Sequence, residues 1–291
     1  MREHLTGFIG YVSNKSNNTI SSYRRDLEKY ISFLEKNGIK TFKDTTKTTV
    51  LTYLLKARSE GFSDATIRRT LSALKTFYAY LTVESPDIKN PVFDIAAPAK
   101  IKTSPKILTA TEVDRFLSAP DIKTAKGRRD RAMLEVLYAT GIKVTELLEL
   151  DVGDVNTVAG YLRCTGGMRE RILPIGAMAQ TAVVRYISNS RDSFLADENE
   201  MALFLNYKGE RMSRQGFWKI IHFYREKAGI KEEITPQILR NSFAAHMLEN
   251  GADLGTISEL LGHSDISTTR VYSGFLKPNI RDIYQKTHPR A

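Results

Sequence analysis

Segment 235–272 holds three side chains whose types suit chemistry on an anionic group. Tyr272 carries a hydroxyl, which can act as a nucleophile once its site activates it. Arg240 carries a planar guanidinium that donates two parallel hydrogen bonds to an anion. His263 carries an imidazole that hydrogen-bonds and titrates near neutral pH. Structural alternatives remain open, namely an amphipathic core tyrosine, an arginine in a structural ion pair and a helix-capping histidine.

The order and spacing of the motifs around these residues are more specific than any one of them. The segment reads Thr-Pro-Gln-Ile-Leu-Arg-Asn-Ser-Phe at 235–243, Leu-Leu-Gly-His at 260–263 and Ile-Ser-Thr-Thr-Arg-Val-Tyr at 266–272. With the turn at 249–254, it resembles the C-terminal signature of the phage-integrase and Xer-type tyrosine recombinases. The resemblance continues through residues 138–141, 161–175 and 213–218. The N-terminal third is similar in pattern to the core-binding domain of that family.

The resemblance implies an exchange of DNA strands that needs no metal and no cofactor. In this reaction a tyrosine attacks a phosphodiester, forms a 3′-phosphotyrosine and releases a 5′-hydroxyl, and a hydroxyl of a second strand reverses the step. It requires an in-line nucleophile, cations for the phosphoryl oxygens and an acid for the leaving oxygen. The matching positions imply that Tyr272 is the nucleophile and that Arg240 and His263 hold the scissile phosphate.

Three positions depart from the family pattern. The first arginine of the family falls at Lys143, which keeps the charge but loses the bidentate fork. The usual histidine before the second arginine is Gln237, which can donate to a phosphate but cannot shuttle protons near neutral pH. The hairpin lysine falls at Gly166, and Arg169 or Arg171 nearby holds its protons too tightly for easy acid work. We therefore predict either a slow, variant recombinase or a paralogue that kept DNA binding and lost cleavage.

Helical periodicity accounts for most of the first hundred residues. Apolar residues recur at helical spacing in 17–37, which Gly38 can end, and in the helix that Ser63 can cap. Residues 5–12 and 48–56 are weaker helix candidates. Four prolines between 85 and 105 interrupt the pattern and predict an interdomain linker.

A second series of elements begins at Thr109, where residues 109–112 fit a capping box. Helices are expected from about 128 to Gly141, from Ser213 to before Gly229, and from 235 to 250. Residues 161–164 and 171–175 flank two glycines and predict a small hairpin, and 202–206 is a candidate third strand. Short helical segments are expected from there to the C-terminus.

The charge of the chain suits a polyanionic partner. The formal net charge is +10, and residues 1–106 hold 18 Lys and Arg against 10 Asp and Glu. Each cation set against a phosphate releases counterions, although a basic but merely soluble protein is the alternative. Basic residues lie mostly off the apolar stripes, as phosphate contacts or as a solvated helix face. The predicted DNA-contacting residues are Arg24, Arg25, Arg68, Arg69, Lys75 and Arg214.

Composition sets the expected compartment. Cys164 is the only cysteine, so no intramolecular disulfide can form and a reducing compartment is expected. The sequence contains neither a long apolar run nor a signal-peptide pattern at its start, so we expect a cytoplasmic protein without a membrane partner.

The predicted fold is mainly α. A helical core-binding (SAM-like) domain at 1–84 and a linker at 85–107 precede a mixed, mostly helical catalytic domain with a small β-hairpin or sheet at 108–291. The resemblance implies double-stranded DNA clamped between the domains by a homotetramer, with or without a second recombinase. Residues 273–291 would supply a helix that docks on a neighbouring protomer, or one that packs on its own domain.

Two other functions remain open. Segment 251–272 could pass for a helix-turn-helix in a transcriptional regulator, which would need no tyrosine at a fixed place. A type IB topoisomerase shares the phosphotyrosine chemistry. The match outside that segment disfavours the regulator, and the chain length with the local motifs disfavours the topoisomerase.

Overall fold

The protein forms two compact units, residues 1–101 and 102–291, each with its own hydrophobic core. A computed structural model describes residues 1–99, 104–165, 170–263 and 265–275. The predicted lysine slot Gly166, the neighbouring Arg169 and all but the first three residues of the segment 273–291, where a C-terminal helix is expected, lie outside the described residues.

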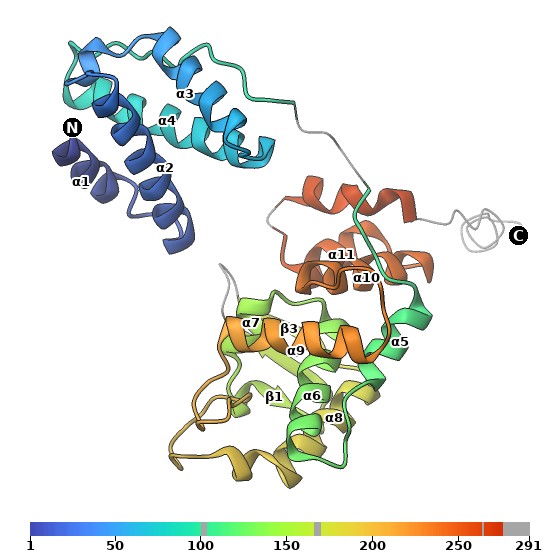
Figure 1. Cartoon of the computed structure of the whole chain (residues 1–291). Helices are drawn as coiled ribbons and strands as arrows, with labels where there is room; N and C mark the ends of the chain where they lie inside the picture. Colours follow the sequence, from blue (N-terminus) through green and yellow to red (C-terminus); the bar gives the residue numbers. More distant parts are fainter. Residues whose placement is uncertain (100–103, 166–169, 264, 276–291) are drawn as a thin grey trace, which may run out of the picture. The chain divides into compact units, whose positions relative to one another are not determined.

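The N-terminal unit is helical, as its sequence pattern predicts (Figure 1). Its elements are α1 (Arg2–Tyr11), α2 (Asn17–Lys36), the 3₁₀ turn η1 (Phe42–Asp44), α3 (Lys47–Ser59) and α4 (Asp64–Glu84). The side chain of Ser63 accepts a hydrogen bond from the Thr66 amide, which confirms the predicted start of α4. Helix α4 packs against α1, α2 and α3, so it forms the centre of the unit.

Burial of aromatic side chains stabilises this unit. Phe8, Tyr30, Phe77 and Tyr78 are fully buried, and burying each ring contributes about 1.5–3 kcal/mol. The core also takes in Ile88, Val92 and Ile95, which lie in the segment expected to be linker. The boundary between the compact units falls at 101/102, toward the C-terminal end of that segment.

The second unit carries most of the chain. Its first elements are α5 (Ala110–Ser118), α6 (Ala125–Thr140), α7 (Val144–Glu149), η2 (Val152–Asp154), β1 (Val155–Asn156), β2 (Tyr161–Cys164) and β3 (Arg171–Pro174). The later elements are α8 (Ala177–Asn189), η3 (Arg191–Phe194), α9 (Arg214–Lys227), α10 (Pro236–Glu249), α11 (Leu254–Leu261) and η4 (Ile266–Phe275). Thr109 and Glu112 form the predicted capping box of α5. Helix α6 packs against both α8 and α10.

The sheet is a short antiparallel one in the order β1-β2-β3, so the predicted hairpin of 161–164 and 171–175 is confirmed. The prediction of a strand at 202–206 is wrong, because that segment makes only isolated bridges from Ala202 to Asp151 and from Leu205 to Arg211. Its partners lie on two different segments, so no continuous ladder forms. The third strand is β1, whose two residues are too few to show alternation in the sequence.

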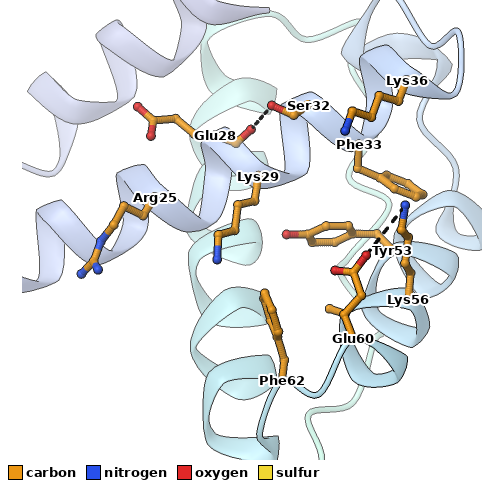
Figure 2. Close-up of a pocket in the computed structure, with 11 residues that line it drawn as sticks. Arg25, Glu28, Lys29, Ser32, Phe33, Lys36, Tyr53, Lys56, Glu60 and Phe62 are labelled. Carbon is orange, nitrogen blue, oxygen red and sulfur yellow. Dashed lines mark hydrogen bonds and ion pairs between the residues drawn. The ribbon is translucent and has the colours of Figure 1, made fainter.

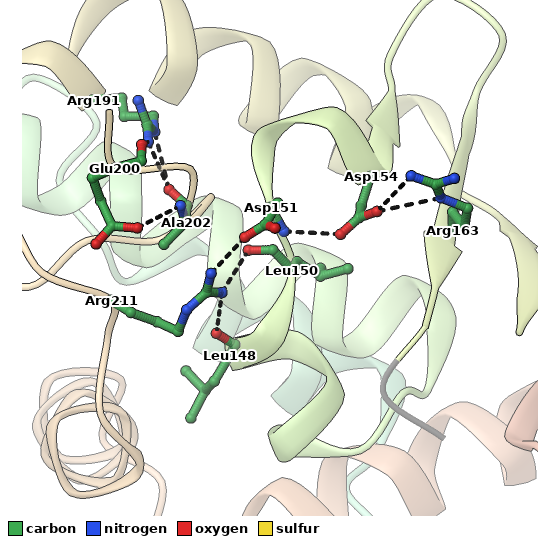
Figure 3. Close-up of polar contacts among 9 residues, drawn as sticks. All are labelled: Leu148, Leu150, Asp151, Asp154, Arg163, Arg191, Glu200, Ala202 and Arg211. Atoms are coloured by element: carbon green, nitrogen blue, oxygen red, sulfur yellow. Dashed lines mark hydrogen bonds and ion pairs between the residues drawn. The ribbon is translucent and has the colours of Figure 1, made fainter. Parts of the chain in front are cut away.

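Arginines hold two stretches of chain, at residues 148–151 and at residues 200–202 (Figure 3). Arg211 donates to the carbonyls of Leu148 and Leu150 at 3.0 and 3.1 Å and pairs with Asp151. Arg191 donates to the carbonyls of Glu200 and Ala202. Because guanidinium groups satisfy these carbonyls directly, in place of a strand partner, both stretches keep their positions without forming a regular strand.

Candidate functional site

Arg240 lies at a junction of three segments. Thr235 caps α10 and Pro236 occupies its first turn, which places Arg240 on the second turn. The residue is 4% exposed, and its guanidinium donates to the carbonyl of Gly141 and, at 2.6 Å, to that of Leu261. Arg240 therefore ties α10 to the C-terminal ends of α6 and α11.

Glycines make this junction possible. Gly141 and Gly262 end α6 and α11 with φ of 60° and 64°, a conformation that other residues rarely adopt. A Cβ on Gly141 would lie 2.4 Å from the ring of Phe243, and one on Gly262 would meet the guanidinium of Arg171. The backbone therefore approaches these side chains more closely than any larger residue would allow.

His263 follows this junction and contacts Arg240. Its Nε2 lies 3.3 Å from Arg240 Nη2, and its Nδ1 lies 2.8 Å from the hydroxyl of the buried Thr269. Since arginine can only donate, Nε2 accepts and the proton of the neutral ring sits on Nδ1. Burial lowers the pKa of His263 to about 4, helped by the positive charges of Arg240, Lys143 and Arg171.

This low pKa predicts a pH-dependent stability. The folded protein binds the His263 proton less readily than the unfolded chain, so stability is full above pH 6.5 and falls as the pH drops toward 4. We expect the free energy of unfolding, from urea titrations between pH 6.5 and 5, to fall more steeply for wild type than for His263→Gln. The exposed His222 offers a matched control, because His222→Gln makes the same substitution outside the junction. Equal slopes for wild type and His263→Gln would contradict the prediction.

Tyr272 lies beside this junction with its hydroxyl inside the protein. The side chain is 3% exposed and packs with Phe243, Ile257 and Leu261. Its hydroxyl donates to Asn241 Oδ1 at 2.8 Å. Burial raises the pKa of Tyr272, and the positive charge of Arg240 offsets only part of this rise. The phenol is therefore protonated at neutral pH.

A cavity of about 410 Å³ brings four of the predicted site residues together. Its lining includes Lys143, Arg214, Trp218, Gln237 and Arg240. The side chain of Lys143 is about half exposed, and its ammonium lies 3.9 Å from Glu146 Oε1. The amide of Gln237 donates to Asn241 Oδ1 at 2.8 Å. An anion in this cavity would therefore meet cations from α6–α7, α9 and α10.

A buried carboxylate supports the Lys143 side of the cavity. Glu146 is 2% exposed and accepts two hydrogen bonds from Arg171, at 3.2 and 2.9 Å, and one from the Lys143 amide. Burial raises the pKa of Glu146, but these hydrogen bonds outweigh it and the net pKa is lowered. Sequence reasoning missed Glu146, although a glutamate on the apolar side of a short helix was a usable signal.

The predicted DNA-contacting residues of the N-terminal unit differ in their exposure and in whether they already bind another group of the protein. Arg24 and Arg25 are exposed on α2, whereas Arg68 donates to the Ala99 carbonyl and Lys75 is partly buried on α4. Arg69 forms two 2.8 Å hydrogen bonds with a buried carboxylate, that of Asp26. Arg69 therefore has a structural partner that its position in the sequence did not indicate.

Arg25 also lines a pocket of about 500 Å³ between α2 and α3 (Figure 2). Lys29, Lys36 and Lys56 stand around it, and Tyr53 points its hydroxyl into it. Glu28 and Glu60 also line the pocket, so its four cations outnumber its carboxylates by two.

Within the described ranges, no group of His, Cys, Asp and Glu is placed to hold a metal ion. Nor does any helix there have the length and apolar character needed to cross a membrane.

Comparison with known proteins identifies relatives along the whole chain. The phage integrase family model matches residues 106–276, and the model of the phage integrase N-terminal SAM-like domain matches residues 5–85. Tyrosine recombinase XerD of Oceanobacillus iheyensis is 43% identical over 99% of this chain and 98% of its own length. Tyrosine recombinase XerD of Listeria innocua is 40% identical over the full length of both chains.

Solved structures agree with this relationship. The XerA recombinase is 26% identical, with a TM-score of 0.54 over 100% of this chain and 99% of its own. The XerH site-specific recombinase, in a pre-cleavage complex with its difH substrate, is 21% identical, with a TM-score of 0.73 over 94% and 82%. The second likeness concerns the fold alone. Together with the family models and the full-length XerD relatives, these findings show that the chain belongs to the phage integrase family.

Proposed function

We propose that the protein is a site-specific DNA recombinase that cleaves and rejoins DNA through a 3′-phosphotyrosine at Tyr272. The observation that carries the proposal is the junction of Arg240 with His263, next to Tyr272 and open to a cationic cavity. Full-length likeness to proteins named tyrosine recombinase XerD supports it. The DNA would be double-stranded, and Arg24, Arg25, Arg68, Arg69, Lys75 and Arg214 are its proposed contacts.

Arg240 would hold the scissile phosphate. Of its five N–H groups, three make the hydrogen bonds to Gly141, Leu261 and His263, which leaves the Nε proton and one Nη1 proton for phosphate oxygens. The Nε proton points away from Cδ whereas Nη1 lies on the Cδ side, so these two donors face different sides of the guanidinium and each would make a single hydrogen bond to a phosphate oxygen. Burial in a low-dielectric site strengthens such a contact as charge develops on the phosphoryl group.

His263 would change its protonation when DNA binds. A phosphate anion close to Nε2 favours the imidazolium and so raises the pKa of His263 from its low resting value. The protonated ring would then donate Nε2–H to a phosphoryl oxygen in place of accepting from Arg240, while Nδ1–H stays on Thr269. Lys143 would add a point charge, and Gln237 an amide donor.

The test is covalent trapping on a nicked suicide substrate, built from the repeats that flank the locus of the protein. The proposal predicts a protein–DNA band on a denaturing gel, with a free 5′-hydroxyl on the released strand. Specific DNA binding without a covalent band would instead indicate a cleavage-deficient DNA-binding paralogue, or one that needs a second recombinase. We further propose that the active form is a tetramer on DNA and that it acts in the cytoplasm.

Lys143 departs from the family pattern, and a substitution there is expected to raise the cleavage rate, whereas most mutations of a site lower it. Lys143→Arg should raise the single-turnover cleavage rate about tenfold, because a guanidinium adds a second hydrogen bond to the phosphate. Lys143→Gln should lower the rate, since it removes the charge from a cavity-lining position. The measurement is the rate of covalent complex formation at saturating DNA. A rate that neither substitution changes would show that Lys143 does not contact the phosphate.

A further inference from the structure

The side chain of Asn241 makes three hydrogen bonds around the nucleophile. Its Oδ1 accepts from the Tyr272 hydroxyl and from Gln237 Nε2, both at 2.8 Å. Its Nδ2 donates to the main-chain carbonyl of Lys106 at 3.1 Å. Asn241 is 8% exposed, so these contacts are made out of bulk water.

The segment that receives this third hydrogen bond is the one that leads into the second unit. The next residue on α10, Ser242, is fully buried and accepts a hydrogen bond from the Leu108 amide at 2.8 Å. Residues 106–108 are therefore attached to α10 at two successive positions, directly after Arg240. Of these two residues of α10, Asn241 is the one that also contacts Tyr272.

The donor and acceptor roles fix the orientation of the amide. A hydroxyl and a side-chain amide nitrogen both donate to one atom of Asn241, so that atom is the oxygen, and the nitrogen faces the Lys106 carbonyl. The alternative orientation would put two nitrogens in contact and two oxygens in contact. The proton of Tyr272 is thus directed at Asn241.

We infer that Asn241 is a positioning residue for Tyr272, which holds its hydroxyl protonated and links it to the carbonyl of Lys106. The inference rests on the proposed function of Tyr272 as the nucleophile. An amide oxygen cannot take up the phenolic proton, so Asn241 is not the base of the reaction. The hydrogen bond favours the neutral phenol and fixes its direction before DNA is present.

Asn241 lies within the 235–243 motif, directly after Arg240, but the motif alone gives it no role. Preorganised groups contribute most to catalysis when their own positions are fixed by neighbours. Here Tyr272 is fixed by Asn241, and Asn241 is fixed by Gln237 and by the chain at Lys106. A shift of Lys106 would remove one of the amide's restraints, so the nucleophile responds to the segment that joins the two units.

The first test measures Tyr272 directly, without DNA. In the full-length protein labelled with ¹³Cζ-tyrosine, Tyr272→Phe assigns the resonance of Tyr272 among the 13 tyrosines. Asn241→Ala should shift this resonance at neutral pH and lower its titration midpoint, because the acceptor that favours the neutral phenol is gone. Asn241→Asp keeps an acceptor oxygen, so its midpoint should stay at or above that of wild type. Ser242→Ala removes the neighbouring attachment without touching Tyr272 and should leave the resonance in place.

The second test measures cleavage at saturating suicide DNA. Asn241→Ala should lower the rate of covalent complex formation about tenfold, the size of one net hydrogen bond, with DNA affinity within about twofold of wild type. Ser242→Ala should cleave at close to the wild-type rate. A Tyr272 resonance that Asn241→Ala does not move would overturn the inference even if wild type cleaves. If wild type binds the DNA without cleaving it, the proposed function fails for the chain acting alone, and the resonance still decides whether Asn241 holds Tyr272.

Discussion

Tyr272→Phe should abolish the covalent protein–DNA complex and leave the affinity for DNA within about twofold of wild type. The substitution removes the hydroxyl oxygen, the atom of Tyr272 that would bond to phosphorus in the proposed reaction, and keeps the ring that packs with Phe243 and Leu261. The lost hydrogen bond to Asn241 lowers the free energy of unfolding by only about 1 kcal/mol. The measurement is the covalent band on a denaturing gel beside a gel-shift titration with the same DNA.

A second tyrosine provides the matched control. The hydroxyl of Tyr138 lies 2.8 Å from His246 Nδ1, also on α10, and is likewise removed from solvent in part. Tyr138→Phe therefore costs a comparable hydrogen bond and should keep the covalent band. A band that persists in Tyr272→Phe would place the nucleophile elsewhere and remove the basis of the proposed function.

The local part of the fold could be predicted because it depends on neighbours in sequence. The start of α4 at Ser63, the capping box at Thr109 and the stop at Gly141 are each decided by a few adjacent residues. The same holds for the hairpin, whose alternation and glycines lie within 15 residues. The irregular segment 202–206 depends instead on Asp151 and Arg211, so its apolar run predicted a strand that does not form.

The candidate site likewise has residues that the sequence predicts and contacts that it does not. The ordered motifs identified Arg240, His263 and Tyr272, and the structure places the first two in direct contact. The contacts that hold them could not be predicted, because Asn241 reaches Lys106 across 135 positions and Arg171 reaches Glu146 across 25. No periodicity or spacing encodes such pairs.

The same limit applies to the predicted DNA contacts. Net charge identified a basic N-terminal third, but it could not separate Arg69, which is paired with the buried Asp26, from the exposed Arg24 and Arg25. An arginine committed to a buried carboxylate is a poorer phosphate ligand than a free one, since the carboxylate would lose its partner. Charge counts therefore locate a binding face better than its individual contacts.

Arg240→Lys should lower the rate of cleavage by about 10²–10³ at saturating DNA, the largest effect expected of a charge-conserving substitution here. Lysine keeps the charge but cannot contact the Gly141 carbonyl, the Leu261 carbonyl and a phosphate together. Because two buried carbonyls lose their donor, stability should fall as well, so cleavage must be measured well below the unfolding temperature of the variant.

Arg211→Lys separates the effect of lost stability from the effect of a lost contact with the phosphate. Arg211 also donates to two carbonyls, those of Leu148 and Leu150, but it does not line the cavity (Figure 3). Its substitution should lower the unfolding temperature and leave the rate of covalent complex formation within about threefold of wild type. If Arg211→Lys slows cleavage as much as Arg240→Lys does, the loss reflects the stability of the unit. If only Arg240→Lys slows it, the slow cleavage comes from the cavity and not from lost stability, because Arg211→Lys also takes the guanidinium donor away from two carbonyls.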